Sequence, residues 1–341
     1  MAETRLADLV IPEVFVPGIL RESIEKSALF NVGLVAVDAA LTSFVQANFG
    51  QKLQIPYLLD IDDAESNISS DDPGVDAVPR KITSAQEDAL KSMRNQSWST
   101  MDLTAAITSN EDPAGAIQRR IGAYWARQMD RHTLSLVNGL VASNIANNAG
   151  DMVHNIGNDN ALPALATELV SASAIIDARH TSGDRWDEFE IVACHSVVFA
   201  NLQKQQLIDF VRGEGPAGGA NIQIPFFHGM RVHVSDQCAT TVGANRTIYN
   251  TYLFRSGALR YGQGTPRIPL EIERKALSGN GEGQEFLVSR NHFCVHPAGF
   301  SWLGAAMAGQ SPTWVELSDA TNWDRVVERK RVPIAVLQSN G

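Results

Sequence analysis

Several features that mark secreted, redox or membrane proteins are missing from this chain. It has three cysteines, Cys194, Cys238 and Cys294, and no Cys-x-x-Cys pair. An odd and widely spaced set is no disulfide framework, and it fits a reducing cytoplasm best. There is no run of about 18 apolar residues and no basic-then-apolar leader, so neither a membrane span nor export is predicted. The sequons at Asn67, Asn95 and Asn245 are therefore predicted to be accidental.

Positive charge is also scarce. The 341 residues carry 28 Lys and Arg against 38 Asp and Glu, a net charge of −10, and the pI is about 5.3. Tight binding to nucleic acid needs clustered basic side chains, so composition argues against it without excluding a protein that encloses nucleic acid. A hydrophobic content of 44% is ordinary for a folded soluble protein. This length predicts two or three subdomains that bury about three quarters of the unfolded surface.

Motifs for common catalytic chemistry are missing too. The chain has no Walker motif, no His-Glu-x-x-His and no Gly-x-Ser-x-Gly elbow. Residues 213–218 match the letters of a dinucleotide fingerprint, which requires a strand before it and a helix after it. We expect a helix before it and an extended segment after it, which favours a flexible loop. His195 and Ser196 are neighbours in a predicted strand and would point to opposite faces, so they form no dyad.

Residues 286–300 do contain groups that can carry chemistry. His292, Cys294 and His296 alternate with Phe293 and Val295. In a strand the outer two would lie about 13 Å apart on one face, whereas zinc holds each ligand at about 2 Å. We therefore expect a core strand with hydrogen-bonded histidines and a buried, inert thiol. An enzyme that uses His292, Cys294 or His296 with a metal or as a thiol remains the alternative.

The strongest predicted element is a helix over residues 112–147. Asp112 is a suitable N-cap and Pro113 suits the first helical position. Apolar residues recur every three or four positions, and His132 lies on this stripe as an expected packing residue. More than 30 helical residues would be about 50 Å long, which predicts a spine for a flat, elongated molecule.

The N-terminal third is unusual. Prolines hold residues 1–18 extended, as an arm that must lie on its own domain or on a neighbour, and a short amphipathic helix is expected after it. Residues 53–59, 78–83 and 96–103 are predicted strands around an acidic loop at 60–74. Together they suggest a long polar hairpin, which is marginal alone and sensible on another subunit. The acids at the start of the loop miss EF-hand spacing, so a solvated loop is favoured over calcium.

The remainder alternates helices and strands without a solenoid repeat. Helices are predicted at 162–180 and 197–210, and a glycine-rich loop at 213–220. Predicted strands lie at 190–196, 230–234, 248–254 and 286–296. The fold class is α+β.

In its order of elements the chain resembles the major capsid proteins of tailed bacteriophages with the Hong Kong ninety-seven-like fold, which encapsulins and herpesvirus shell proteins share. The stretch DPAGAIQRRIGAYWARQ at 112–128 resembles the start of the spine helix in one coat-protein family. Further similar stretches are HSVVFANLQKQ at 195–205, TYLF at 251–254, EIERKAL at 271–277, FLVSRNHFCVHPAGF at 286–300 and NWDRVVERKRVPI at 322–334. Each stretch is weak alone, and their order and spacing carry the resemblance over nearly the whole chain.

The resemblance implies a role for each region. The loop at 213–220 would face a five- or six-fold axis. The implied divisions are an N-terminal arm at 1–50, an extended β-hairpin loop at 51–110, a peripheral domain with the spine helix at 111–159, an axial domain at 160–245, and return strands at 246–341 that complete the axial and peripheral domains.

The function implied is assembly, with no enzyme activity and no cofactor. Copies of the chain would form hexamers, pentamers and an icosahedral shell around double-stranded DNA, without sequence-specific binding and without a membrane. Scaffold, portal and decoration proteins are implied partners, and the setting is the virion, after assembly in the host cytoplasm. Because the chain begins at its apparent arm, a separate scaffold or none is expected. The alternative is an encapsulin-like compartment shell.

Side chains on the predicted hairpin are the candidate contacts between subunits. We expect inter-subunit ion pairs from Arg80, Lys81, Glu87, Lys91 and Arg94. The competing interpretation for each is a solvated surface charge worth under about 1 kcal/mol. Some relatives crosslink a loop lysine to an asparagine. Lys81 and Lys91 lie in the matching region, but no partner asparagine or catalytic glutamate can be matched, so crosslinking is not expected.

Overall fold

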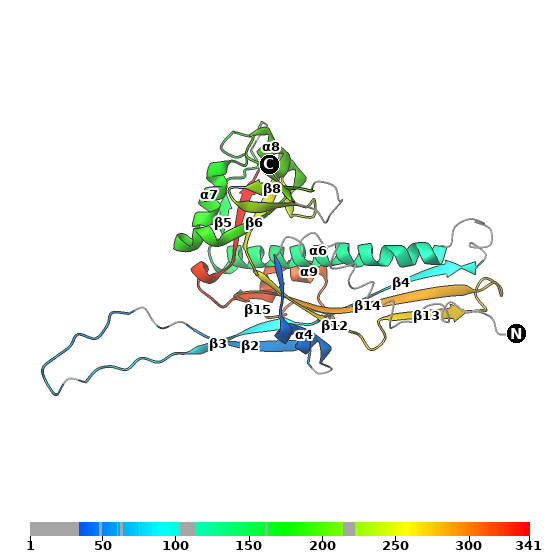
Figure 1. Ribbon diagram of the computed structural model, residues 1–341, viewed down its shortest axis with the longest axis horizontal. Coiled ribbons are helices and arrows are strands. Elements are labelled where there is room, and N and C mark those ends of the chain that lie inside the picture. The colour runs from blue at the N-terminus through cyan, green and yellow to red at the C-terminus, as the bar shows by residue number, and fades with distance from the viewer. Residues whose placement is uncertain are drawn as a thin grey trace.

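The computed structural model describes residues 34–47, 50–59, 61, 64–74, 76–102, 113–160, 163–213 and 222–341. Four predictions fall outside these residues: the arm before residue 34, the short helix that follows it, the N-cap at Asp112, and the loop at 214–220. A long helix runs between two bodies built on different sheets (Figure 1). This helix, α6 (Pro113–Asn147), has 35 residues and confirms the predicted spine.

One body is built on a five-stranded sheet. Its central strand is β14 (Gln284–Pro297), the predicted strand at 286–296. β14 pairs antiparallel with β4 over ten residues, with β13 at its N-terminal half and with β12 at its C-terminal half. The other members are β4 (Ser92–Met101), β13 (Leu270–Lys275), β12 (Leu259–Gly264) and β1 (Val35–Val37), which is parallel to β12.

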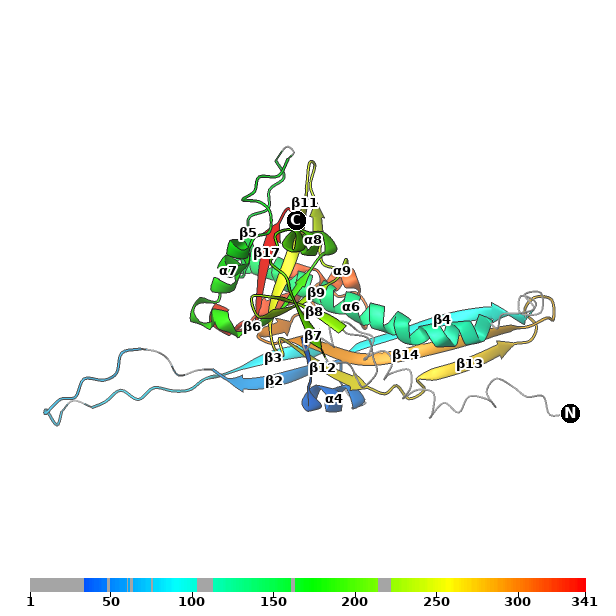
Figure 2. The same ribbon diagram turned by 45° about the horizontal axis from the view of Figure 1, so that its top comes forward.

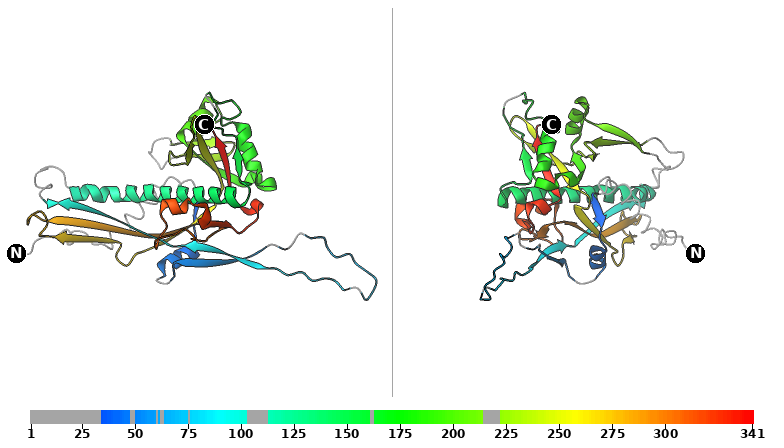
Figure 3. Two further views of the ribbon diagram at one scale, coloured as in Figure 1. Left: turned by 180° about the vertical axis from the view of Figure 1, so that it is seen from behind. Right: turned by 60° about the vertical axis from the view of Figure 1, so that its left-hand side comes forward.

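The second body is an eight-stranded sheet with two helices, α7 (Ala172–His180) and α8 (Ser196–Lys204). The view from behind places it on the opposite side of α6 from the first sheet (Figure 3). It confirms the predicted strands at 230–234 and 248–254. The predicted strand at 190–196 ends at Cys194, because His195 is the N-cap of α8 and Ser196 begins that helix, so these two residues are not strand neighbours. Its strands are β5 (Val153–Asn155), β17 (Ile334–Ser339), β11 (Thr247–Arg255), β6 (Phe189–Cys194), β9 (Met230–Val234), β8 (Ile222–Phe227) and β7 (Asp209–Gly213), with β10 (Thr240–Val242) beside β11.

A separate hairpin projects from the first body. It joins β2 (Lys52–Leu58) and β3 (Ser84–Leu90), and α4 (Ala39–Gln46) packs beside it. The loop between these strands extends far beyond the rest of the chain (Figure 2). Two expectations were wrong here. Residues 78–83 form no strand, because the paired part of the hairpin begins only at Ser84. The predicted strand at 96–103 belongs to β4, which pairs with β14 instead of the hairpin.

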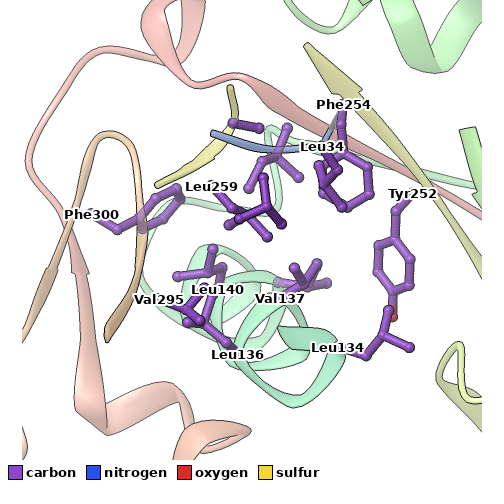
Figure 4. Close-up of a cluster of buried hydrophobic side chains, with 14 of the residues drawn as sticks. Leu34, Leu134, Leu136, Val137, Leu140, Tyr252, Phe254, Leu259, Val295 and Phe300 are labelled. Carbon is purple, nitrogen blue, oxygen red and sulfur yellow. The ribbon is translucent and has the colours of Figure 1, made fainter. Parts of the chain in front are cut away.

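Both bodies share one hydrophobic core around the C-terminal half of α6. Leu136, Val137 and Leu140 of the helix meet Phe254 of one sheet and Val295 of the other (Figure 4). Short segments close this core, namely β15 (Phe300–Trp302), β16 (Trp323–Arg325), α9 (Trp314–Leu317) and the 3₁₀ turns Ala320–Asn322 and Arg329–Arg331. A further 3₁₀ turn, Gly183–Glu188, packs against α7.

Two predicted helices are shorter than expected. Residues 163–170 form turns, and α7 begins only after its N-cap, Ser171. The other helix ends at Lys204, because Gln206 takes a positive φ of 57° and Leu207 N–H bonds back to the Leu202 carbonyl at 3.1 Å. This Schellman ending lacks the usual glycine, so no residue marks the stop of the helix in the sequence.

The strand β7 corrects one premise about the fingerprint at 213–218. The strand β7 leads into the motif, where we expected a helix. The strand β8 follows the motif in the sequence and pairs antiparallel with β7. The next element that the structure describes after the motif is the strand β8, whereas the fingerprint requires a helix. No helix among the described residues is long and apolar enough to cross a membrane.

Candidate assembly surfaces

The stretch at 286–300 is the core strand that the sequence predicted. Odd-numbered residues of β14 face α6: Ser289 accepts a hydrogen bond from Trp125 Nε1 at 3.0 Å, and Phe293 packs edge-on against the buried His132. Even-numbered residues face the other way, toward α4 and β3. His292, Cys294 and His296 thus share one face, as expected, and the described residues contain no group of three metal-ligating side chains.

His296 makes a structural pair with a carboxylate. Its Nε2 lies 2.9 Å from Glu87 Oε2, and Glu87 Oε1 accepts the Gly299 N–H at 3.0 Å. The two side chains are 1% and 7% exposed. Buried charged groups are tolerated only when their hydrogen bonds are satisfied, so this pair fixes β3 to the end of β14.

Cys294 is equally enclosed. It lies in a small cluster with Leu41, Phe44 and Ala89, and burial raises the pKa of its thiol to about 12. Burial also raises the pKa of Cys194 to about 12. These thiols stay protonated near neutral pH. A protonated thiol is a poor nucleophile, because the thiolate is the reactive form. The alternation of His and Cys in this stretch therefore serves packing.

Hydrogen bonds hold the base of the hairpin to its own chain. The Tyr57 hydroxyl donates to the Val326 carbonyl at 2.9 Å, and Lys52 Nζ donates to the Leu303 carbonyl at 2.9 Å. Asp88 N–H donates to Ser301 Oγ at 3.0 Å. The direction in which the hairpin leaves the body is therefore set within one subunit.

The loop beyond this base leaves large apolar side chains in water. Leu58, Ile61, Ile68, Val78 and Ile82 are 56% to 87% exposed. An extended run of such residues normally marks an interaction site. The loop also carries exposed carboxylates, at Glu65, Asp71, Asp72 and Asp76, that take part in none of the ion pairs among the described residues.

The five predicted contact residues occupy different environments. Arg80 and Lys81 are exposed on the loop, where Arg80 donates to the Glu65 carbonyl at 3.2 Å. Glu87 is buried against His296, and Lys91 Nζ donates to the Ala47 carbonyl at 3.1 Å. Arg94 lies in β4, off the hairpin, and bonds the Pro312 carbonyl. The hydrogen bonds described here for Glu87, Lys91 and Arg94 thus all lie within one chain.

A second exposed surface was not anticipated. We call it the open sheet face; it is the side of β4, β14 and β13 that points away from α6. Phe286 and Val288 are half-buried there and belong to none of the apolar clusters among the described residues. The surface consists of Met93, Asn95, Ser97 and Ser99 of β4, Phe286, Val288, Arg290 and His292 of β14, and Glu271 and Glu273 of β13. Residues 94–97 are all polar, so no alternation in the sequence shows which side of β4 is covered.

The sequence and fold have known relatives. Residues 61–333 match the Gp13-like family, described as major capsid protein 13-like. The major capsid protein of Bacillus phage SPP1 is 34% identical over 338 residues, which cover 98% of this chain and 97% of that protein.

Solved capsid structures share the fold. The cyanophage Pam1 capsid matches with a TM-score of 0.55 at 8% identity, over 93% of each chain. The capsid of Ralstonia phage GP4 matches with a TM-score of 0.53 at 9% identity, over 93% of this chain and 92% of that one. At such low identity the likeness is one of fold alone, and it agrees with the predicted α+β architecture.

Proposed function

The chain belongs to the Gp13-like family of major capsid proteins, and we propose that its copies form hexamers and pentamers that close an icosahedral shell around the double-stranded DNA of a tailed phage. The 34% identity to a major capsid protein over nearly the full length of both chains carries this proposal. Every contact surface described above then serves assembly.

The proposed division of labour follows the elements. Residues 1–50 act as an arm and 51–110 as the extended loop. Residues 111–159 with the C-terminal strands make the peripheral domain around α6, and 160–245 make most of the axial domain, whose tip meets its copies around the symmetry axes. The shared core around α6 supports this reading, because it ties both sheets to one rigid axis.

The proposed mechanism is head-to-tail contact. A ring of identical subunits needs two different surfaces that fit each other on neighbouring copies. The projecting loop and a receptor on the next copy provide such a pair. The cost of ordering a long loop is offset when it lies across a neighbour. Arg80 and Lys81, both exposed on the loop, are the most accessible of the predicted inter-subunit contacts.

The proposed partners follow from the charge. A net charge of −10 suits a wall that encloses DNA without gripping it, and no sequence-specific binding is expected. Scaffold, portal and decoration proteins would bind the shell, and assembly would take place in the host cytoplasm. No catalytic role or cofactor is proposed, and the enclosed thiols of Cys194 and Cys294 support that view.

Electron microscopy of the expressed chain tests the proposal. The expected result is closed shells, alone or with a phage scaffold protein, and shells from infected cells that hold DNA. Small discrete oligomers under every condition would contradict the proposal. Shells that hold a cargo enzyme in place of DNA would point to a compartment shell instead.

A further inference from the structure

We propose that a cavity between α6 and β4 binds a small aromatic anion, with its ring among aromatic side chains and its negative charge on Arg94. The site is separate from the surfaces described for assembly and goes beyond the proposed function. Trp125, Phe293 and Trp314 form the aromatic walls, and the cavity has a volume of about 260 Å³. Drug-sized ligands occupy pockets of about 300–1,000 Å³, so this cavity suits a molecule of one or two rings.

Four elements supply the walls of the cavity. Trp125 and His132 come from α6, where a spacing of seven residues places them on one face of the helix. Arg94 comes from β4, Phe293 from β14, and Trp314 from the first position of α9. The Trp125 indole is held by its hydrogen bond to β14 at 3.0 Å, and the rings of His132 and Phe293 pack edge-on with centres 4.9 Å apart. These walls are therefore in place before a ligand arrives, which lowers the entropic cost of binding.

A buried polar group that lines the cavity lacks a partner. His132 is 3% exposed, and its ring nitrogens form no hydrogen bond with any residue that the structure describes. Burial lowers the pKa of this histidine to about 3, so its imidazole is neutral and has one nitrogen that accepts a hydrogen bond. Because a buried polar group without a partner is costly, a ligand that donates a ring N–H or a hydroxyl to this nitrogen gains affinity.

The charge of the cavity favours an anion. Its described lining contains one cation, Arg94, and no acid, in a chain whose net charge is −10. Arg94 Nη2 donates to the Pro312 carbonyl, and Arg94 takes part in none of the ion pairs among the described residues. The acid whose charge acts on it, Glu316, already accepts the N–H groups of Thr313 and Ala308. A guanidinium has five N–H donors, so Arg94 keeps donors for a carboxylate.

The walls favour an aromatic ring over an aliphatic group of the same size. Aromatic pairs in edge-on or offset contact gain stability beyond the area that they bury. The guanidinium of Arg131 lies 4.6 Å from the centre of the Trp314 ring, so a second cation stands beside this wall. An aromatic carboxylate with a ring N–H matches the aromatic walls, the guanidinium of Arg94 and the imidazole of His132 together. Indole-3-acetate is a simple molecule of this class.

Ligand-observed NMR titrations of the full-length, unassembled chain test the inference. We expect indole-3-acetate to bind with a Kd of about 1 mM or tighter. Indole-3-acetamide has the same ring without the charge, and cyclohexylacetate has the charge without an aromatic ring. Each should bind at least tenfold more weakly than indole-3-acetate.

Two arginine variants locate the site. Arg94→Gln should weaken the binding of indole-3-acetate at least tenfold and leave that of indole-3-acetamide within about twofold. The matched control is Arg127→Gln, because Arg127 is exposed on α6 and does not line the cavity. This control should bind both probes as the wild type does. If Arg94→Gln does not fold, the comparison of the three probes on the wild-type chain still decides whether the site selects an aromatic anion.

The part played by His132 is tested with a methylated probe. 1-Methylindole-3-acetate cannot donate a ring N–H, so the wild-type chain should bind it at least threefold more weakly than indole-3-acetate. In His132→Leu this preference should disappear, because leucine accepts no hydrogen bond. A preference that persists in His132→Leu would exclude the imidazole as the acceptor.

Three results would overturn the inference. The first is no binding of indole-3-acetate at concentrations up to 10 mM. The second is equal binding of indole-3-acetate and its amide, and the third is an equal loss of affinity in Arg94→Gln and Arg127→Gln, which would indicate a general effect of charge. Each would leave the proposed function standing, because particle formation tests that function separately.

Discussion

The buried pair of Glu87 and His296 shows how a reactive-looking motif becomes structural. The carboxylate accepts from the Gly299 N–H and lies 2.9 Å from the imidazole, inside the joint between hairpin and sheet. Alternation in the sequence predicted the strand and the burial of Cys294. It could not supply Glu87, because the partner lies 209 residues away and only the fold brings the two together.

Removing this carboxylate tests its role. Glu87→Ala leaves the imidazole and the Gly299 N–H buried without their partner, which should lower the free energy of unfolding by about 3 kcal/mol. Urea unfolding of the unassembled chain measures this. Glu273→Ala, an exposed carboxylate on β13, serves as the control and should change it by less than about 0.5 kcal/mol. Equal effects of the two variants would show that the pair has no structural role.

His132 gives a pH-dependent prediction. Burial lowers its pKa from 6.5 to about 3, so the folded chain holds a neutral imidazole where the unfolded chain takes up a proton. Its contribution to stability is present above about pH 6.5 and is lost as the pH falls toward 3. Between pH 7 and pH 5 the loss should be about 2 kcal/mol.

The variant His132→Leu isolates this contribution. Its stability should fall less between pH 7 and pH 5 than that of the wild type, by about 2 kcal/mol, whatever its stability at pH 7. Urea midpoints at the two pH values give the comparison. Parallel pH profiles for both proteins would mean that His132 is not held neutral.

Among the elements, α6 depends on a close approach at Gly139. A Cβ there would lie 1.9 Å from the Leu317 carbonyl oxygen and 2.6 Å from Trp323 Nε1. Trp323 Nε1 donates a hydrogen bond to that carbonyl at 2.8 Å. Glycine is thus required for the helix to meet α9 and the turn before β16.

Whether Gly139→Ala raises or lowers the free energy of unfolding tests this packing. In an ordinary helix Gly→Ala stabilises by about 1 kcal/mol, whereas here the clash should make Gly139→Ala destabilising by about 2 kcal/mol or more. Arg127→Ala on the exposed side of α6 should have little effect. Thermal or urea unfolding of the unassembled chain decides the sign, and a more stable Gly139→Ala variant would refute the close contact.

Local signals in the sequence explain which elements could be predicted. The three-to-four periodicity and Pro113 defined α6, and alternation defined β14, because both patterns are local. The end of α8 was missed because Gln206 takes the positive φ without a glycine. The pairing of β4 with β14 was missed because it depends on contacts nearly 200 residues apart. The open sheet face follows only from that pairing.

At the scale of the whole molecule, the loop between β2 and β3 is not needed for a single chain to fold. Leu59 N–H bonds the Thr83 carbonyl at 2.9 Å, so the hairpin closes there without the residues between. Replacing residues 60–82 by Asn-Gly, a favoured two-residue turn, should keep the free energy of unfolding within about 1 kcal/mol of the wild type. Particle yield should fall at least tenfold, because the loop no longer reaches a neighbour.

A loop of the original length made of Gly and Ser separates two causes of the lower particle yield, namely the loss of loop length and the loss of loop side chains. If the side chains of the loop provide the contact, the substituted loop should also fail to support assembly. Unfolding curves and sedimentation of both variants give the readouts. Normal particle yield from the shortened chain would exclude the loop as an assembly element.

Electron cryomicroscopy of particles formed by the wild-type chain tests the central claim most directly. We expect closed shells built of five- and six-fold rings, in which the loop between β2 and β3 of each copy contacts a neighbouring copy. A reconstruction in which the chain forms only small separate oligomers, with or without a scaffold protein, would contradict its role as the shell-forming subunit.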